Sequence, residues 1–143
     1  RKMVELSPSF EMECEVLDRD HKQLLRRIND IIAVIDGEHS DECAKLTPDL
    51  VNFAKQHFAR EEALLTKVGY PDVKKHVEHH RALDRKMESI LNLASVADDN
   101  PLAGKKLKSE LVFFLMDDII NADLDFKSFV EDKQQESGNS SGP

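Results

Sequence analysis

Residues 47–67 read TPDLVNFAKQHFAREEALLTK, and this stretch decides the fold. Its apolar residues recur three and four positions apart, which is the spacing of one face of an α-helix. Thr47 before Pro48 suits an N-cap followed by a first-turn proline. His57 and Glu61 lie one turn apart on the same apolar face. The stretch therefore predicts a helix over about 47–67, with room for a leading turn from Asp41, that turns two metal-ligating side chains towards the core.

Three further segments show the same helical spacing, at about 18–36, 71–94 and 102–132. The first has Asp18 as a candidate N-cap and Gly37 as a stop. Four helices of this length with short connections predict an all-α fold, an antiparallel up-down four-helix bundle.

The chain ends carry different signals. Residues 1–17 contain two residues, Pro8 and Phe10, that suit an extended N-terminal arm packed across the bundle. Residues 134–143 are rich in Ser, Gly and Asn, so we expect a disordered tail or linker there. The predicted organisation is an arm at 1–17, the bundle at 18–133 and the tail at 134–143.

Composition excludes several classes of function. The chain has 143 residues, about one domain, and its 28 acidic against 20 basic residues argue against a nucleic-acid partner. No apolar stretch approaches the roughly 20 residues that span a bilayer, and the start lacks the apolar core of a signal peptide. Cys14 and Cys43 lie far apart, so neither a disulfide framework nor a zinc ribbon is indicated. We expect a cytoplasmic protein with reduced thiols that is not inserted in a membrane.

Histidines and carboxylates stand at core-facing positions in all four helices. A lone histidine on an apolar face is more often a satisfied core residue than a ligand. However, burying this many ionisable groups is costly unless they are paired or bound to metal. The four clusters together therefore favour one metal site. They are His21; His57 with Glu61; His76 with His80; and Asp118 with Asp123.

The order of these motifs resembles the hemerythrin family, and more closely its bacterial single-domain and sensor-domain branch. The resemblance runs from about Phe10 to Phe129. The matching stretches are VLDRDHKQLL at 16–25, HFAREE at 57–62, GYP at 69–71 ahead of His76 and His80, and FLMDDI at 114–119 with Asp123.

The resemblance implies a bundle around two non-haem iron ions, oxo- or hydroxo-bridged when oxidised, that bind dioxygen or another small gas. Carried over by position, His21 and His57 would bind one iron, and His76 and His80 the other. Glu61 and Asp123 would bridge both. The apolar oxygen pocket would be formed by Leu24, Phe58, Leu83, Leu115 and Ile119.

Asp118 departs from the family pattern, which has a histidine ligand at this position. Its carboxylate either ligates iron or falls short and leaves water in the position. A ligating carboxylate adds negative charge and favours the ferric state, so the substitution predicts a poor reversible carrier. Three milder departures are Phe114 for a usual Trp, Asp20 for Gln or Glu, and His79 for Glu.

We therefore expect a sensor input domain that responds to oxygen or to redox state and passes a signal to a downstream output domain. A free-standing oxygen-binding or storage protein is the alternative. A di-iron oxidase or peroxidase is less favoured, because ferritin-like sites use Glu-x-x-His pairs and no core-facing position has one, so we do not expect an enzyme. A bundle that has lost its metal, or that takes zinc or manganese, is the remaining interpretation.

Overall fold

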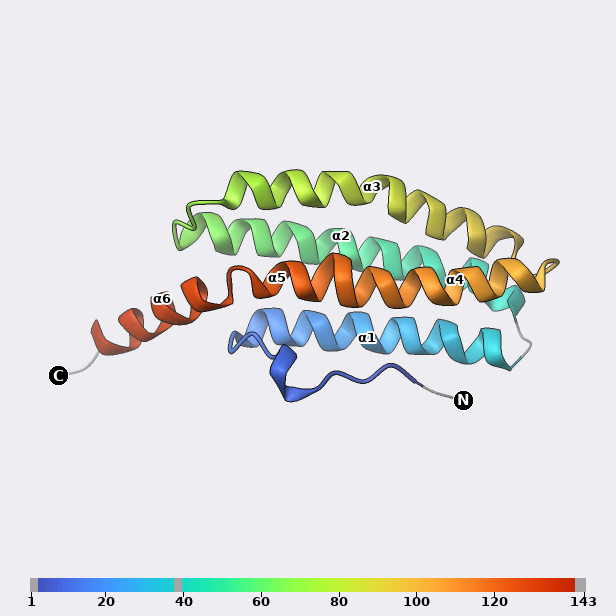
Figure 1. Cartoon of the computed structure of the whole chain (residues 1–143), viewed down its shortest axis with the longest axis horizontal. Coiled ribbons are helices and arrows are strands. Elements are labelled where there is room, and N and C mark those ends of the chain that lie inside the picture. The colour runs from blue at the N-terminus through green and yellow to red at the C-terminus, as the bar shows by residue number, and fades with distance from the viewer. Residues whose placement is uncertain (1–2, 38–39, 141–143) are drawn as a thin grey trace.

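The computed structural model describes residues 3–37 and 40–140, and it confirms the all-α bundle. Four long helical segments lie side by side (Figure 1). Helix α1 packs on α2 and α4, and α3 packs on both α2 and α4. The helices are α1 (Glu15–Asp36), α2 (Cys43–Lys67), α3 (Val73–Val96), α4 (Pro101–Phe113), α5 (Ala122–Leu124) and α6 (Lys127–Ser140).

The first helix starts earlier than predicted, and the leading turn allowed before residue 47 is present. Helix α1 begins at Glu15 rather than residue 18, and the carboxylate of Asp18 instead accepts the backbone N–H of Met12 at 2.7 Å. Helix α2 begins at Cys43, after the 3₁₀ turn η2 (Ser40–Glu42), so Pro48 lies inside the helix. The fully buried Cys43 extends the apolar face by a turn, which outweighs the hydrogen bond that Pro48 cannot donate.

The fourth helix is not the continuous α-helix predicted over 102–132. Asn100 caps α4 by accepting from two backbone N–H groups, at Leu102 and Ala103. The α-helix then gives way to the π-helical segment η3 (Phe114–Asn121) and resumes as α5. A further break separates α5 from α6 at residues 125–126, where Phe126 turns fully into the core.

The chain ends also depart in part from prediction. The arm is largely extended, as expected, with one 3₁₀ turn η1 (Pro8–Phe10). Two hydrogen bonds between Val4 and the Asn29 amide hold it to α1. A disordered tail was expected from residue 134, but α6 continues to Ser140. Gln134, Gln135 and Glu136 are good helix formers and extend the helix, whereas the Ser, Gly and Asn that follow have low helix propensity. Residues 141–143 lie outside the described part of the chain.

Two apolar clusters fill the bundle, one on each side of the histidines. The larger cluster runs between α1, α2, α3 and α4 and includes Leu24 and Phe58. The smaller one joins the arm, α2 and α6 through Met12, Leu65 and Val130, and it also includes Phe126. The buried ionisable side chains therefore lie between two dry regions.

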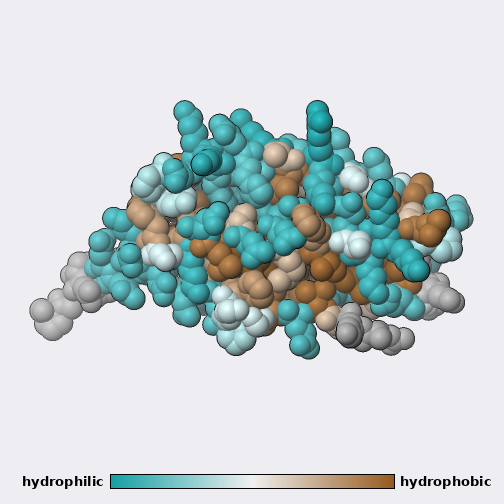
Figure 2. Space-filling model, viewed as in Figure 1, coloured by the Kyte–Doolittle hydropathy of each residue, from teal (hydrophilic) through white to brown (hydrophobic). Residues whose placement is uncertain are grey.

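The outer face of the bundle is mainly hydrophilic, with a few hydrophobic side chains between the polar ones near the middle of the view (Figure 2). Within residues 3–37 and 40–140, no helix is long and apolar enough to cross a membrane. Cys14 and Cys43 are both buried free thiols.

Candidate metal centre

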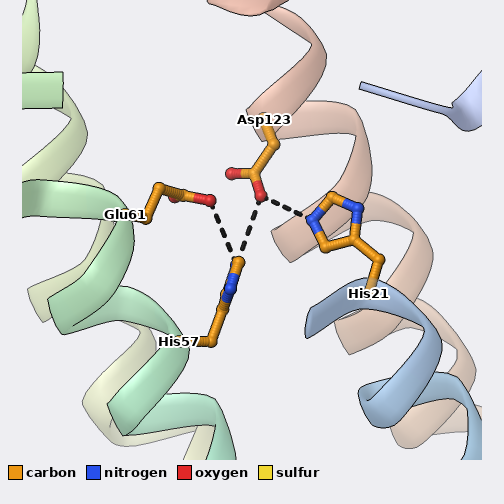
Figure 3. Close-up of side chains that lie close together, drawn as sticks. All are labelled: His21, His57, Glu61 and Asp123. Carbon is orange, nitrogen blue, oxygen red and sulfur yellow. Dashed lines mark hydrogen bonds and ion pairs between the residues drawn. The ribbon is translucent and has the colours of Figure 1, made fainter. Parts of the chain in front are cut away.

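Six ionisable side chains from four helical segments converge in the bundle interior. Figure 3 shows one half of this arrangement, in which His21 from α1 and His57 from α2 both turn towards Asp123 of α5. All six are between 0% and 9% exposed. They are His21, His57, Glu61, His76, His80 and Asp123.

Glu61 faces both pairs of histidines with its two carboxylate oxygens. Oε2 lies 3.0 Å from His57 Nε2. Oε1 lies 3.0 Å from His80 Nε2 and is also in contact with His76 Nε2. Each oxygen therefore serves a different pair, which is the placement that a bridging carboxylate needs.

Asp123 divides its oxygens in the same way. Oδ2 lies 2.8 Å from His21 Nε2 and 3.3 Å from His57 Nε2, and Oδ1 lies 3.4 Å from His76 Nε2. The carboxylate is 1% exposed. Asp123 is thus placed, like Glu61, where a carboxylate could bridge two metal ions.

The ligand atoms form two groups of four that share both carboxylates. In one group the atoms of His21, His57, Glu61 and Asp123 all lie within 4.8 Å of one another, and in the other so do those of Glu61, His76, His80 and Asp123. These are the pairs expected for the two irons. Imidazole and carboxylate donors suit iron in its common oxidation states.

The hydrogen bonding within the site supports a cation between these groups. Oε2 of Glu61 has no hydrogen-bond partner among the described residues, because its 3.0 Å contact with His57 lacks hydrogen-bond geometry. When Nδ1 of His57 donates to Asp20, the lone pair of Nε2 faces carboxylate oxygens. Lone pairs that face one another need a proton or a metal ion between them, so the residues present fit a pair of metal ions.

Without metal, protons take this role. Burial disfavours the charged form of His57, but the surrounding carboxylates of Asp123, Asp20 and Glu61 outweigh burial and raise its pKa well above the usual range. For His76, burial is likewise outweighed by Asp123 and Glu61, which raise the pKa to about 9. Burial raises the pKa of Asp123, but its hydrogen bonds with Glu61 and the histidines hold that pKa well below its usual range. Metal binding therefore displaces protons from the site.

Two carboxylates outside the six orient the metal-facing histidines. Asp20 accepts from His57 Nδ1 at 2.9 Å and from Arg60 Nε and Nη2 at 2.9 and 3.0 Å. Burial raises the pKa of Asp20, but the hydrogen bonds with His57 and Arg60 lower it overall. Glu62 accepts from His80 Nδ1 at 2.7 Å. Each contact leaves Nε2 of its histidine free to bind metal.

The sequence did not identify these two positioning residues. Asp20 stood out only as a departure from the family pattern, and Glu62 only as the last residue of the stretch HFAREE at 57–62. Their position in the sequence could have identified them, because each is an acidic residue directly beside a candidate ligand. On a packed helix, such a residue can reach an imidazole of the neighbouring helix.

Asp118 lies outside both groups of ligand atoms. It stands within the π-helical segment η3, which brings residues five apart towards the same side of the helix and so places it on the side of Asp123. Burial raises the pKa of its carboxyl group. Its backbone carbonyl accepts from His79 Nε2 at 2.8 Å, so His79, half-buried, supports η3 rather than joining the six.

The side chains predicted to form the oxygen pocket are all buried, at 0–6% exposure, in the larger apolar cluster. The ring of Phe58 stacks on that of His80, with centroids 4.2 Å apart. This side of the site is therefore dry. The residues are Leu24, Phe58, Leu83, Leu115 and Ile119.

A helical bundle with two buried histidine pairs and two shared carboxylates defines a dinuclear metal-binding protein. Residues 13–121 match the model of the hemerythrin HHE cation binding domain, so the chain belongs to the hemerythrin family. The matched stretch ends two residues before Asp123, which the structure brings into the site. The cofactor of this family is a pair of non-haem iron ions.

Curated relatives agree with this assignment. A bacteriohemerythrin from Pseudomonas aeruginosa is 26% identical over 122 residues, which cover 85% of this chain and 78% of the relative. One from Campylobacter jejuni is 28% identical over 82 residues, 56% of this chain and 61% of the relative. A myohemerythrin from Theromyzon tessulatum is 27% identical over 92 residues, 64% of this chain and 70% of the relative.

Proposed function

We propose that this domain binds dioxygen or another small gas at a di-iron centre and reports oxygen or redox state as a sensor input domain. The observation that carries the proposal is the pair of buried ligand groups joined by Glu61 and Asp123. When bound, a pair of iron ions supplies reversible redox chemistry and an affinity for small gaseous ligands. Its irons would be held by His21 with His57 and by His76 with His80.

The surrounding residues control what reaches the centre. The larger apolar cluster excludes water on the side of Phe58 and Leu115, so a small apolar gas can enter more readily than ions or bulk solvent. Asp20 and Glu62 hold two imidazoles in the orientation that binds metal. These residues favour binding and response over catalysis, and we propose no enzymatic activity.

Asp118 supports sensing rather than carriage. With its carboxylate outside both groups, the His76 and His80 group consists of two imidazoles and two shared carboxylates, so an iron held there would lack a third imidazole. The open cavity lined by His76 would give water access to that iron. Access of water aids oxidation of ferrous iron, whereas a carrier needs a ferrous state that persists. We therefore propose rapid oxidation in air, followed by a change in the bundle that an attached output domain detects.

A free-standing oxygen-binding or storage protein is the second candidate. Its support is the dry apolar cluster beside the ligand groups, which would shield a bound gas from water.

The lifetime of the ferrous protein in air separates the two. We expect the reduced protein to oxidise within one exposure to air, and at least about tenfold faster than Asp118→His, which restores the imidazole. Visible absorption follows the oxidation, and metal analysis gives the iron content of both proteins. Reversible oxygen uptake over many cycles by the unmodified chain would support storage and contradict sensing.

A further inference from the structure

The two halves of the centre are not equally shielded. His57 and His21 are 0% and 2% exposed, whereas His80 and His76 are 5% and 9% exposed. These differences in exposure are small, but the carboxylates that bond the outer nitrogens of the imidazoles differ in exposure in the same direction. The side chain of Asp20, behind His57, is 7% exposed, whereas that of Glu62, behind His80, is 33% exposed.

The outer hydrogen bonds differ in the same sense. Asp20 is fixed by two hydrogen bonds from Arg60 in addition to its bond from His57. Glu62 makes one such bond, to His80, and its other oxygen has no protein hydrogen bond among the described residues. The orientation of His57 is therefore better held than that of His80.

An open cavity of about 550 Å³ reaches the weaker half. It lies at the turn between α2 and α3 and is lined by His76 itself, with Ala122 and His79 beside it. Two carboxylates and one ammonium group stand at its wall, Asp72, Asp125 and Lys75. Their excess negative charge favours the approach of a divalent cation.

The cavity beside the other half is smaller. It measures about 150 Å³ and lies between the N-terminal arm and α1, next to His21 and Phe10. The arm is held on both sides of this cavity, by Val4 at Asn29 and by the backbone N–H of Met12 at Asp18. The space open to an ion on this side is therefore narrower than at the α2–α3 turn.

We propose that the metal ion held by His76 and His80 exchanges with solvent through the cavity at the α2–α3 turn, while the ion held by His21 and His57 is retained. The inference rests on the proposed di-iron centre and adds that its two positions are kinetically different. The chain thus has one resident metal position and one exchangeable position.

Release of iron to a chelator tests this. The full chain is loaded with iron(II) without oxygen, its iron content is measured, and an excess of a chromogenic iron(II) chelator is added. We expect two phases of equal amplitude whose rates differ by at least about tenfold. Protein isolated after the first phase should retain one iron per chain.

Three variants assign the fast phase. Glu62→Gln should accelerate it and leave the slow phase unchanged, because it weakens the support of His80 only. Ala122→Leu should slow it by narrowing the cavity, whereas Ala82→Leu, the same change at an exposed position of α3, should alter neither phase. Circular dichroism checks the fold of each, and Glu62→Gln remains decisive if Ala122→Leu does not fold.

The possible failures are distinguishable. Fewer than two irons per chain before chelation would overturn the di-iron centre itself. Two irons that leave in a single phase, or a fast phase that Glu62→Gln does not change, would overturn the exchange inference and leave the centre intact.

Discussion

Asp20 should contribute to iron affinity although it is not a predicted ligand. Its carboxylate accepts three hydrogen bonds, one from His57 Nδ1 at 2.9 Å and two from Arg60 at 2.9 and 3.0 Å. In Asp20→Asn, one oxygen becomes an NH₂ group that cannot accept. If the amide oxygen takes the place of Oδ2, which accepts from His57 Nδ1 and Arg60 Nε, the NH₂ group faces the donor Arg60 Nη2. In either orientation the pair with Arg60 is weakened, and the negative charge behind the imidazole of His57 is lost.

Loss of such an outer partner typically lowers metal affinity by about 10- to 100-fold. We expect a value near the upper end of this range, because Asp20 is buried and its charge also favours a positively polarised imidazole. This corresponds to about 2 to 3 kcal/mol of binding free energy. The effect should fall on the ion held by His21 and His57.

The assay is an anaerobic competition titration of iron(II) between the protein and a chromogenic chelator. Glu15→Gln is the matched control, since Glu15 lies on the same helix and, among the residues that the structure describes, forms an ion pair only with the exposed Arg19. Affinity of Asp20→Asn within about twofold of the unmodified chain, with the fold intact by circular dichroism, would refute the positioning role of Asp20.

Three further predictions follow from the buried site. In the metal-free protein, the free energy of unfolding should fall by up to about 3 kcal/mol as the pH rises from 6.5 through about 9, because protonation of His76, whose pKa is raised in the folded state, favours folding. Urea titrations on both sides of this pH range measure the loss, and a free energy of unfolding that does not change with pH would contradict the prediction. Iron removal should lower the melting temperature, since a ligand at a thousandfold excess over its Kd stabilises the fold by about 4 kcal/mol. Equal melting temperatures of the iron-loaded and iron-free proteins, measured by calorimetry, would count against a preformed site. Phe126→Ala should lower the free energy of unfolding by about 3 to 5 kcal/mol, because the ring is fully buried and lies edge-on to that of His76, with ring centroids 5.0 Å apart. The control Phe113→Ala, which removes a half-exposed ring, should lower it by about 1 kcal/mol or less.

Much of this structure can be predicted from helical spacing. The apolar face of residues 47–67 identifies α2 and also places His57 and Glu61 one turn apart towards the core. The same reasoning identifies α1 and α3 and their histidines. Helical spacing identifies these ligands because they occupy positions of the apolar face and do not change the period of the helix.

The fourth helical segment shows the limit of this reasoning. Three- and four-residue spacing continues from Leu107 to Phe126, so the sequence predicts one α-helix. The π-helical hydrogen bonds of η3 and the break before α6 leave no comparable pattern, because both depend on how Asp123 and Phe126 pack against other helices. Whether Asp118 reached the ligand groups could not be predicted for the same reason.

The roles of Asp20 and Glu62 also depend on contacts between helices. Asp20 of α1 meets His57 and Arg60 of α2, and Glu62 of α2 meets His80 of α3. Spacing within one helix shows which residues share a face, but it does not show which residue of a neighbouring helix each will contact.

Anomalous diffraction from crystals of the iron-loaded chain would test the central claim most directly. We predict two iron peaks, one next to His21 and His57 and the other next to His76 and His80, with Glu61 and Asp123 at coordination distance from both. The Asp118 carboxylate should lie beyond about 3.5 Å from either iron, well outside the roughly 2.0 to 2.2 Å of a bound oxygen. A single peak, or two peaks that do not share Glu61 and Asp123, would contradict the proposed centre.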